Sequence, residues 1–149
     1  MEKPIIVGES NPYGGDDYYA LYPAPDGCSG HRLCCLILGM QRAAYLEAFE
    51  RVNLVRGKWS IPAARAAANE LTARPNRKLI LLGAKVSMAF GLKFSPFGTY
   101  SERGCAMLIL PHPSGLNRMW GEDGVIQRAR DAVLAFAPEE LSPFVGTGK

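Results

Sequence analysis

Four short apolar runs divide the chain and predict buried β-strands. They are "PIIVG" at 4–8, "RVNLVRG" at 51–57, "KLILLG" at 78–83 and "CAMLILP" at 105–111. In the last two runs the apolar residues are continuous rather than alternating, which is typical of strands covered on both faces of a parallel sheet. The second run is the weakest, because Asn53 interrupts it.

Segments with helical spacing lie between these runs. Apolar residues recur at helical intervals over 33–52, "SIPAARAAANEL" at 60–71 begins like a capped helix, "AKVSMAFG" at 84–91 fits a short helix closed by glycine, and 125–136 is amphipathic. Strands that alternate with helices predict an α/β domain with three layers. The length fits a single domain over residues 1–149, and we expect its tail to be loose from about residue 138.

Composition narrows the class of protein. Hydrophobic residues make up 48% of the 149, enough to fill one core, and no apolar run reaches the roughly 18–20 residues of a membrane span. The N-terminus lacks the apolar core of a signal peptide, so we expect a cytoplasmic protein without membrane contact. The net charge of +3 permits a polyanionic partner without requiring one.

Four cysteines lack the spacing of metal ligands. Cys34 and Cys35 are adjacent, which suits neither a zinc site nor a familiar cluster site. We interpret the cysteines as small, reduced hydrophobic residues and expect neither metal nor cofactor.

Polar or glycine-rich segments follow three of the predicted strands. They are "GESNPYGG" at 8–15, "NLVRG" at 53–57 and "HPSGLNR" at 112–118. In open parallel sheets, ligands bind outside the carboxyl ends of the strands, so we expect these segments to meet there. The amide of Asn53, inside an apolar strand, could read the edge of a ring such as a pyrimidine. The alternative is a structural asparagine bonded to a neighbouring loop.

The first of these segments places several polar groups at one strand end. Gly8 lets the backbone approach a ligand closely, Glu9, Ser10 and Asn11 are polar, and Tyr13 offers a flat ring. The alternative is an ordinary turn rich in Asn, Pro and Gly.

The third segment holds His112 between two prolines. An imidazole fixed at a strand end can donate a hydrogen bond to an oxygen that gains charge in a transition state. The alternative is a capping histidine packed on Trp120. Beyond it, Leu116 or Met119 could wedge into a base stack, with Arg118 on a phosphate.

Five segments, in this order, resemble motifs of the uracil-DNA glycosylase superfamily. They are "VGESNP", "GCSGHRL", "VNLVRG", "LILLGAKVSMAFG" and "HPSGLNR", which together extend over most of the chain. The resemblance is greatest to the G-E-A-P-G families, although the cysteines that hold their iron–sulfur cluster are absent. It implies a central four-stranded parallel sheet between helices, and hydrolysis of the N-glycosidic bond of uracil, or of a modified or mismatched pyrimidine, flipped out of DNA.

The resemblance also implies roles for individual residues. The two ways of aligning the first motif leave open whether Glu9 or Asn11 positions the water, and Tyr22 is an alternative to Tyr13 for stacking on the base. The implied catalytic residues are Glu9, His112 and Asn11; the base-binding residues are Gly8, Ser10, Tyr13, Tyr22 and Asn53; the DNA-binding residues are Ser114, Gly115, Leu116, Asn117 and Arg118.

One departure leaves the substrate open. The insertion after the first motif is acidic, and Asp16 and Asp17 near a DNA groove would repel phosphate. Besides a monomeric glycosylase acting on DNA, two alternatives remain. One is an enzyme acting on a free nucleoside or nucleotide, and the other is a non-catalytic protein that binds a nucleobase, a nucleotide or DNA.

Overall fold

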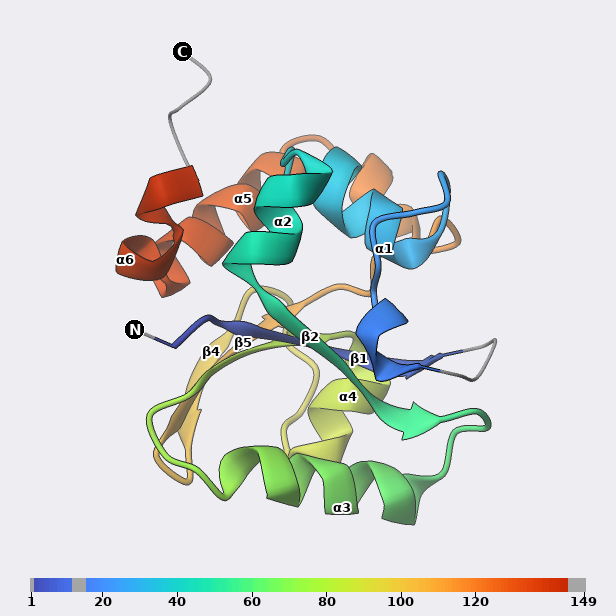
Figure 1. The fold of residues 1–149 in the computed structure, drawn as a ribbon, viewed down its shortest axis with the longest axis vertical. Coiled ribbons are helices and arrows are strands. Elements are labelled where there is room, and N and C mark those ends of the chain that lie inside the picture. Colours follow the sequence, from blue (N-terminus) through green and yellow to red (C-terminus); the bar gives the residue numbers. More distant parts are fainter. Residues whose placement is uncertain (1, 12–15, 145–149) are drawn as a thin grey trace.

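One mixed sheet forms the centre of the molecule (Figure 1). The structure is a computed structural model that describes residues 2–11 and 16–144, and within these ranges the sheet has five strands in the order β2–β1–β3–β5–β4. Four neighbouring strands run parallel, and β4 pairs antiparallel with β5 at one edge. The strands are β1 (Ile5–Asn11), β2 (Glu50–Arg56), β3 (Lys78–Leu82), β4 (Thr99–Glu102) and β5 (Cys105–Leu110).

The four apolar runs predicted the four parallel strands, but the expected four-stranded sheet is wrong by one strand. In β4 only Tyr100 is apolar, and the other three residues of the strand are exposed. Such an edge strand gives little hydrophobic signal, because just one of its sides pairs with the sheet and few of its side chains reach the core.

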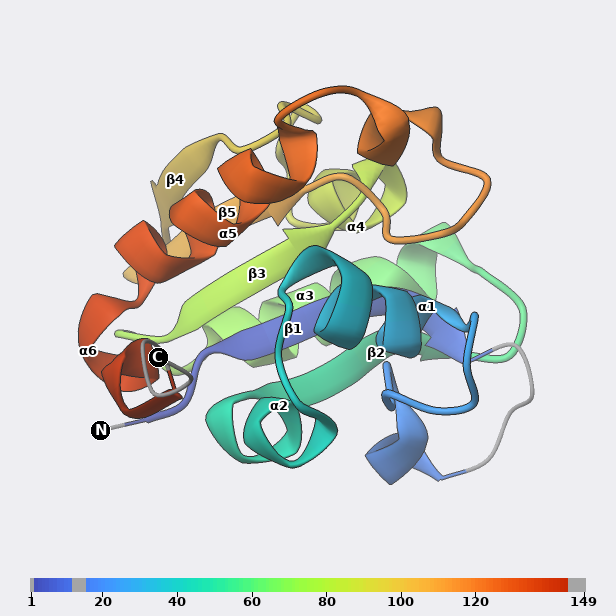
Figure 2. The ribbon, with the colours of Figure 1, turned by 90° about the horizontal axis from the view of Figure 1, so that it is seen from above.

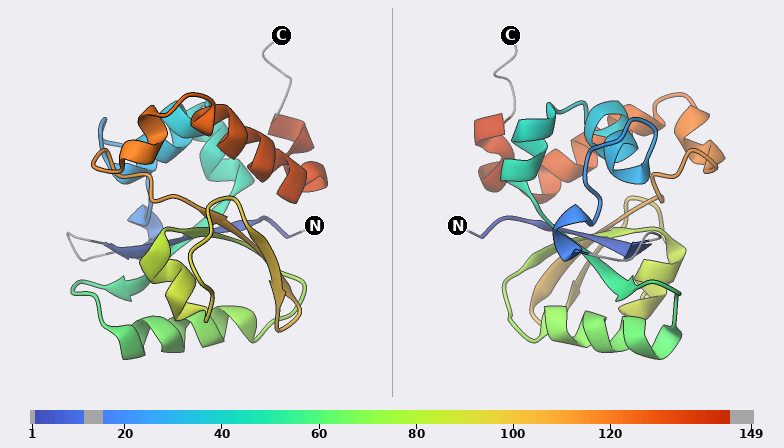
Figure 3. Two further views of the ribbon diagram at one scale, coloured as in Figure 1. Left: turned by 180° about the vertical axis from the view of Figure 1, so that it is seen from behind. Right: turned by 45° about the vertical axis from the view of Figure 1, so that its right-hand side comes forward.

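Helices cover both faces of the sheet and make three layers (Figures 1 and 3). The predicted helix at 60–71 is α3, and its Ser60 caps the Ala63 amide. One face carries α3 (Ile61–Thr72) and α4 (Ala84–Ala89); the other carries α1 (Ser29–His31), the π-helix η2 (Arg32–Ile37), α2 (Arg42–Ala48), α5 (Val125–Phe136) and α6 (Pro138–Leu141).

The continuous apolar strands supply both layers of the core. Along β3, Leu79 and Leu81 pack toward α3 and α4, whereas Ile80 and Leu82 pack toward the opposite layer. All four are almost fully buried, and burial of such a side chain contributes about 1.5–3 kcal/mol. This two-sided burial explains why the strands do not alternate with polar residues.

Two expectations about helices are wrong. The stripe over 33–52 is not one helix: it breaks after η2, where Gly39 has a φ of 66°, and Val52 already belongs to β2. The segment from residue 138 is helical rather than loose as far as Phe144, and Leu141 is buried in the core. None of the helices within the described ranges is long and apolar enough to cross a membrane.

The topology creates a natural binding position. From β1 the chain passes to β2 on one side and then crosses to β3 on the other side. Figure 2 shows the carboxyl ends of these strands together, beside the orange segment that follows β5. In such sheets the strand order changes direction at one position, here next to β1. The segments that follow the two neighbouring strands leave on opposite faces of the sheet at that position, and a crevice opens between them.

Candidate functional site

A cleft of about 480 Å³ opens at the carboxyl ends of the parallel strands. Its residues come from the second half of β1, from the middle of β2, from the segment 16–30 and from the residue after Pro111. The polar strand ends therefore meet, as the sequence predicted. Six residues expected in the site line this cleft: Gly8, Glu9, Ser10, Tyr22, Asn53 and His112.

Gly8 and Asn53 are neighbours in the register of β1 and β2. A Cβ atom on residue 8 would lie 2.4 Å from Asn53 Oδ1 and 3.1 Å from Leu21 Cδ1. Only glycine therefore leaves room for the Asn53 amide beside the backbone of β1. Because Asn53 also lines the cleft, this amide is a donor and an acceptor available to a planar polar ligand.

Glu9 and His112 face each other across the cleft. Nε2 of His112 lies 3.7 Å from Oε2 of Glu9, and the two side chains are 32% and 28% exposed. This distance is too long for a direct hydrogen bond, so each group keeps its capacity to contact a ligand.

The surroundings of His112 fix the position of its proton. The Ser114 amide donates to Nδ1 at 3.1 Å, so the proton of the neutral ring lies on Nε2, the atom nearer Glu9. Burial lowers the pKa of His112, and the positive charge of Lys85 lowers it further, while Glu9 acts in the opposite direction. The ring is therefore neutral near pH 7, with its Nε2–H toward the cleft.

Several contacts hold the His112 backbone in place. The His112 carbonyl accepts hydrogen bonds from Trp120 Nε1 at 2.7 Å and from Asn117 Nδ2 at 3.0 Å. Behind the ring, a Cβ on Gly83 would lie 3.2 Å from His112 Cβ. Asn117 Oδ1 also accepts from the Met119 amide, so both ends of the Asn117 amide are used within the loop. Asn117 thus supports the backbone of His112.

The wall formed by 16–22 is anchored by residues that the sequence analysis missed. Tyr45, buried in the core, donates from its hydroxyl to the Leu21 carbonyl at 2.9 Å. Arg51 donates to the Ala20 carbonyl at 3.0 Å, and its guanidinium lies 5.7 Å from the centre of the Tyr22 ring. These contacts hold Tyr22 in the cleft. No local sequence signal marks them, because each partner is more than 20 residues away.

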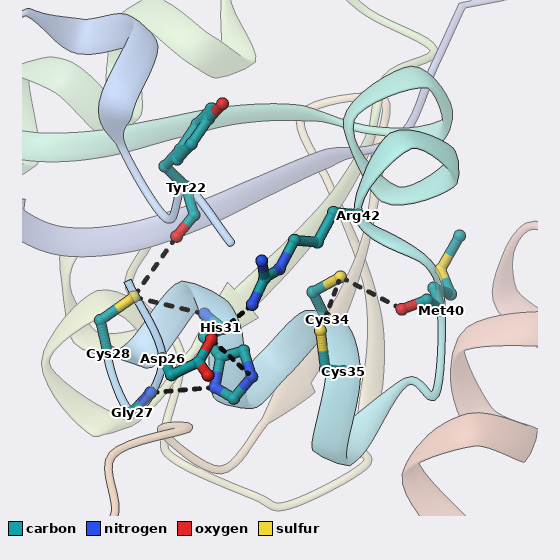
Figure 4. A network of polar contacts seen from close by, with 9 residues as sticks. All are labelled: Tyr22, Asp26, Gly27, Cys28, His31, Cys34, Cys35, Met40 and Arg42. Carbon is teal, nitrogen blue, oxygen red and sulfur yellow. Dashed lines mark hydrogen bonds and ion pairs between the residues drawn. The ribbon is translucent and has the colours of Figure 1, made fainter. Parts of the chain in front are cut away.

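A second network supports the turn at 26–31 (Figure 4). The Cys28 thiol donates to the Tyr22 carbonyl at 3.5 Å and accepts from the His31 amide at 3.4 Å, so it caps α1. A Cβ on Gly30 would lie 2.1 Å from the Tyr22 carbonyl oxygen. The "GCSG" segment therefore packs tightly against the wall that carries Tyr22. Asp26 contacts both Arg42 and His31.

The acidic insertion is partly neutralised. Arg56, at the end of β2, forms two hydrogen bonds with the Asp17 carboxylate, at 3.1 and 2.7 Å. Asp16 caps a short 3-10 helix (η1, Asp17–Tyr19) through the Tyr18 amide, and it lines the cleft. Asp16 is thus the acidic residue of this insertion that faces the site.

Lys85 is a further residue that the sequence analysis did not select. It lies in the first turn of α4, with Nζ 4.0 Å from Glu9 Oε1 and 5.9 Å from the centre of the Trp59 ring. The Glu9 carboxylate therefore lies between an ammonium group and the His112 ring. A sequence signal was available, because Lys85 comes only two residues after the apolar run at 78–83 that forms β3.

The remaining predicted residues lie beyond the cleft or are not placed. Leu116 is 92% exposed and Arg118 is exposed, whereas Ser114 Oγ accepts from the Leu116 amide. Tyr13 lies outside the described residues, and for Asn11 the description is limited to its backbone at the end of β1.

The described part of the chain contains no group of three or more His, Cys, Asp or Glu residues arranged to hold a metal ion. Comparison of the sequence with protein-family models and with curated proteins finds no match. The geometry of the cleft and the sequence motifs are thus the observations that bear on function.

Proposed function

We propose that the protein is a DNA base glycosylase, which hydrolyses the N-glycosidic bond of uracil or of a modified or mismatched pyrimidine flipped from DNA. The observation that carries this proposal is the pairing of His112 with Glu9. A neutral imidazole with Nε2–H and a carboxylate oxygen 3.7 Å away face the same cleft, which also holds the amide of Asn53. The motifs that resemble the uracil-DNA glycosylase superfamily supply all three residues.

The reaction places negative charge on the base and positive charge on the sugar, and His112 and Glu9 suit these two charges. When the bond from C1′ to the base nitrogen breaks, the electron pair passes to the base and the sugar becomes oxocarbenium-like. His112 donates from Nε2 to the base oxygen that gains negative charge. Glu9 stabilises the cation and accepts a proton from the water whose oxygen bonds to C1′. The released base anion then takes a proton from solvent.

Asn53 and Tyr22, which line the cleft, recognise the base. The Asn53 amide pairs with the polar edge of a pyrimidine, and the Tyr22 ring packs on the base. Flipping costs roughly a few kcal/mol, which these contacts offset. The exposed Leu116 fills the space that the base leaves in the stack, and Arg118 contacts a phosphate.

One observation favours a second candidate, an N-glycosidase that acts on a free nucleoside. Asp16 lines the cleft, and a carboxylate there repels the phosphates of a DNA strand but not an uncharged nucleoside.

The test is release of the base from oligonucleotides that each carry one uracil, mismatched thymine, hypoxanthine or hydroxymethylated pyrimidine. Abasic sites are detected by alkaline cleavage, and the corresponding nucleosides are assayed in parallel. Loss of one donor to a developing oxyanion costs about 100- to 1000-fold in rate, so His112→Ala should lose that much and Glu9→Gln should also be impaired. Glu70→Gln, an exposed carboxylate on α3, is the matched control.

Each result has a distinct meaning. Abasic sites that require both His112 and Glu9 support the proposal. Release from nucleosides alone supports the second candidate. Saturable binding of oligonucleotide without any product, or release that survives in His112→Ala, refutes the proposed chemistry.

A further inference from the structure

A second groove, of about 580 Å³, adjoins the cleft. Its floor is apolar and includes Leu36, which is 45% exposed, together with Trp120 and Ile126. Two arginines, Arg32 and Arg118, also line it. An exposed apolar surface bordered by cations suits a ligand with both apolar faces and negative charge.

The same two segments build the cleft and the groove. Ser29 and Gly30 line the cleft, and Arg32 lines the groove. Likewise His112 lines the cleft and Gly115 the groove. A ligand that enters the cleft can therefore continue into the groove without leaving the surface.

A hydrogen bond joins the two segments at the boundary between the two spaces. Arg32 donates from Nε to the Pro113 carbonyl at 2.9 Å, and a Cβ on Gly115 would lie 3.6 Å from Nη1 of Arg32. The hydrogen bond through Nε orients the guanidinium beside the loop and leaves its two terminal nitrogens as donors.

The charges of the groove are not used inside the protein. Among the described residues, neither Arg32 nor Arg118 forms an ion pair, whereas Arg42, Arg56 and Arg74 each pair with a carboxylate. The acidic residues next along the chain, 122 and 123, do not line the groove. Two uncompensated guanidinium groups on one groove attract a polyanion.

We propose that this groove binds the sugar–phosphate backbone next to the flipped nucleotide, with phosphates on Arg32 and Arg118 and sugars on the apolar floor. The inference rests on the proposed function, because it takes DNA as the substrate. It adds Arg32 to the DNA-binding residues and directs the strand away from the wall that carries Asp16.

The experiment measures equilibrium binding of a single-stranded oligonucleotide with a stable abasic analogue, over a range of salt concentrations. Each phosphate contact that is removed should reduce the slope of log K against log salt by about 0.7. We therefore expect this change for Arg32→Gln and for Arg118→Gln, and about twice the change for the double variant. Arg65→Gln, an exposed arginine on α3 across the sheet, is the control and should leave the slope unchanged.

Arg32→Gln could disturb the fold, because Arg32 bonds to the loop. Arg118→Gln tests the inference without this complication, because Arg118 is exposed and its side chain has no described partner. Slopes equal to that of the original protein in both single variants would overturn the inference, as would an equal loss in Arg65→Gln. Groove-dependent binding without base release would refute the proposed function alone. Base release from nucleosides without DNA binding would refute the proposed role of the groove and would leave the proposed chemistry of the cleft intact.

Discussion

A Glu9→Gln substitution removes the anion that faces His112 and preserves the shape of the side chain. Across the 3.7 Å between Nε2 and Oε2, two unit charges interact by about 1 kcal/mol at the dielectric of water and about 4 kcal/mol at an effective dielectric of 20. Because both side chains are roughly one-third exposed, solvent screening favours the lower end. Loss of this attraction removes the effect that raises the pKa of His112, so in the variant that pKa should fall further below its ordinary value.

The assay is an NMR titration of imidazole nitrogens in the original protein and in the variant. The chain has only two histidines, so His31, which contacts Gly27 and Asp26, is the internal reference. Its signals should be the same in both proteins. At high pH, the nitrogen shifts of His112 should also show the proton on Nε2. An unchanged or raised pKa of His112 in Glu9→Gln, or a proton on Nδ1, would refute the facing geometry on which the mechanism depends.

Three further predictions concern stability. Folding lowers the pKa of His112, so the unfolded chain binds more protons than the folded protein below about pH 6.5. The free energy of unfolding should therefore fall as the pH drops through this value. In His112→Asn, the dependence of this free energy on pH, measured by urea unfolding at several pH values, should be weaker. Gly8→Ala places a Cβ against the Asn53 amide and should cost about 1–3 kcal/mol in urea unfolding; no loss would mean that the two do not pack together. The hydrogen bond from Lys78 keeps the pKa of Glu140 low against the opposing effect of burial, so Lys78→Met should cost about 1.5–3 kcal/mol. Adding Glu140→Gln should restore part of this loss, because a neutral amide costs less to leave unpaired.

The sequence predicted the elements that depend on local pattern. Leu79 to Leu82 are continuous and apolar because the strand is buried on both faces, and that pattern is visible without a structure. The break at Gly39 could not be predicted from the sequence, because the apolar spacing of 33–52 continues across it while the backbone adopts a positive φ. The edge strand β4 was missed since its residues contribute little to the core.

The candidate site was predictable where it depends on strand ends. Glu9 and His112 lie near or just beyond the carboxyl ends of parallel strands, and topology alone brings such positions together. Asn53 lies in the middle of β2 and reaches the cleft because it is the neighbour of Gly8 in β1. The supporting residues were not predictable in this way. Tyr45 and Arg51 act on the cleft wall through backbone carbonyls of a distant segment, which requires knowledge of the tertiary packing.

The positions of the two tryptophans have a practical consequence. Trp120 donates from its indole nitrogen to the carbonyl of His112, and Trp59 lies beside Lys85 on the other side of the Glu9 carboxylate. The chain contains no other tryptophan. Tryptophan fluorescence of this protein, excited selectively at wavelengths that its tyrosines do not absorb, therefore originates from the two flanks of the cleft. A shift in emission on mixing with an oligonucleotide would report events there directly, without an attached dye.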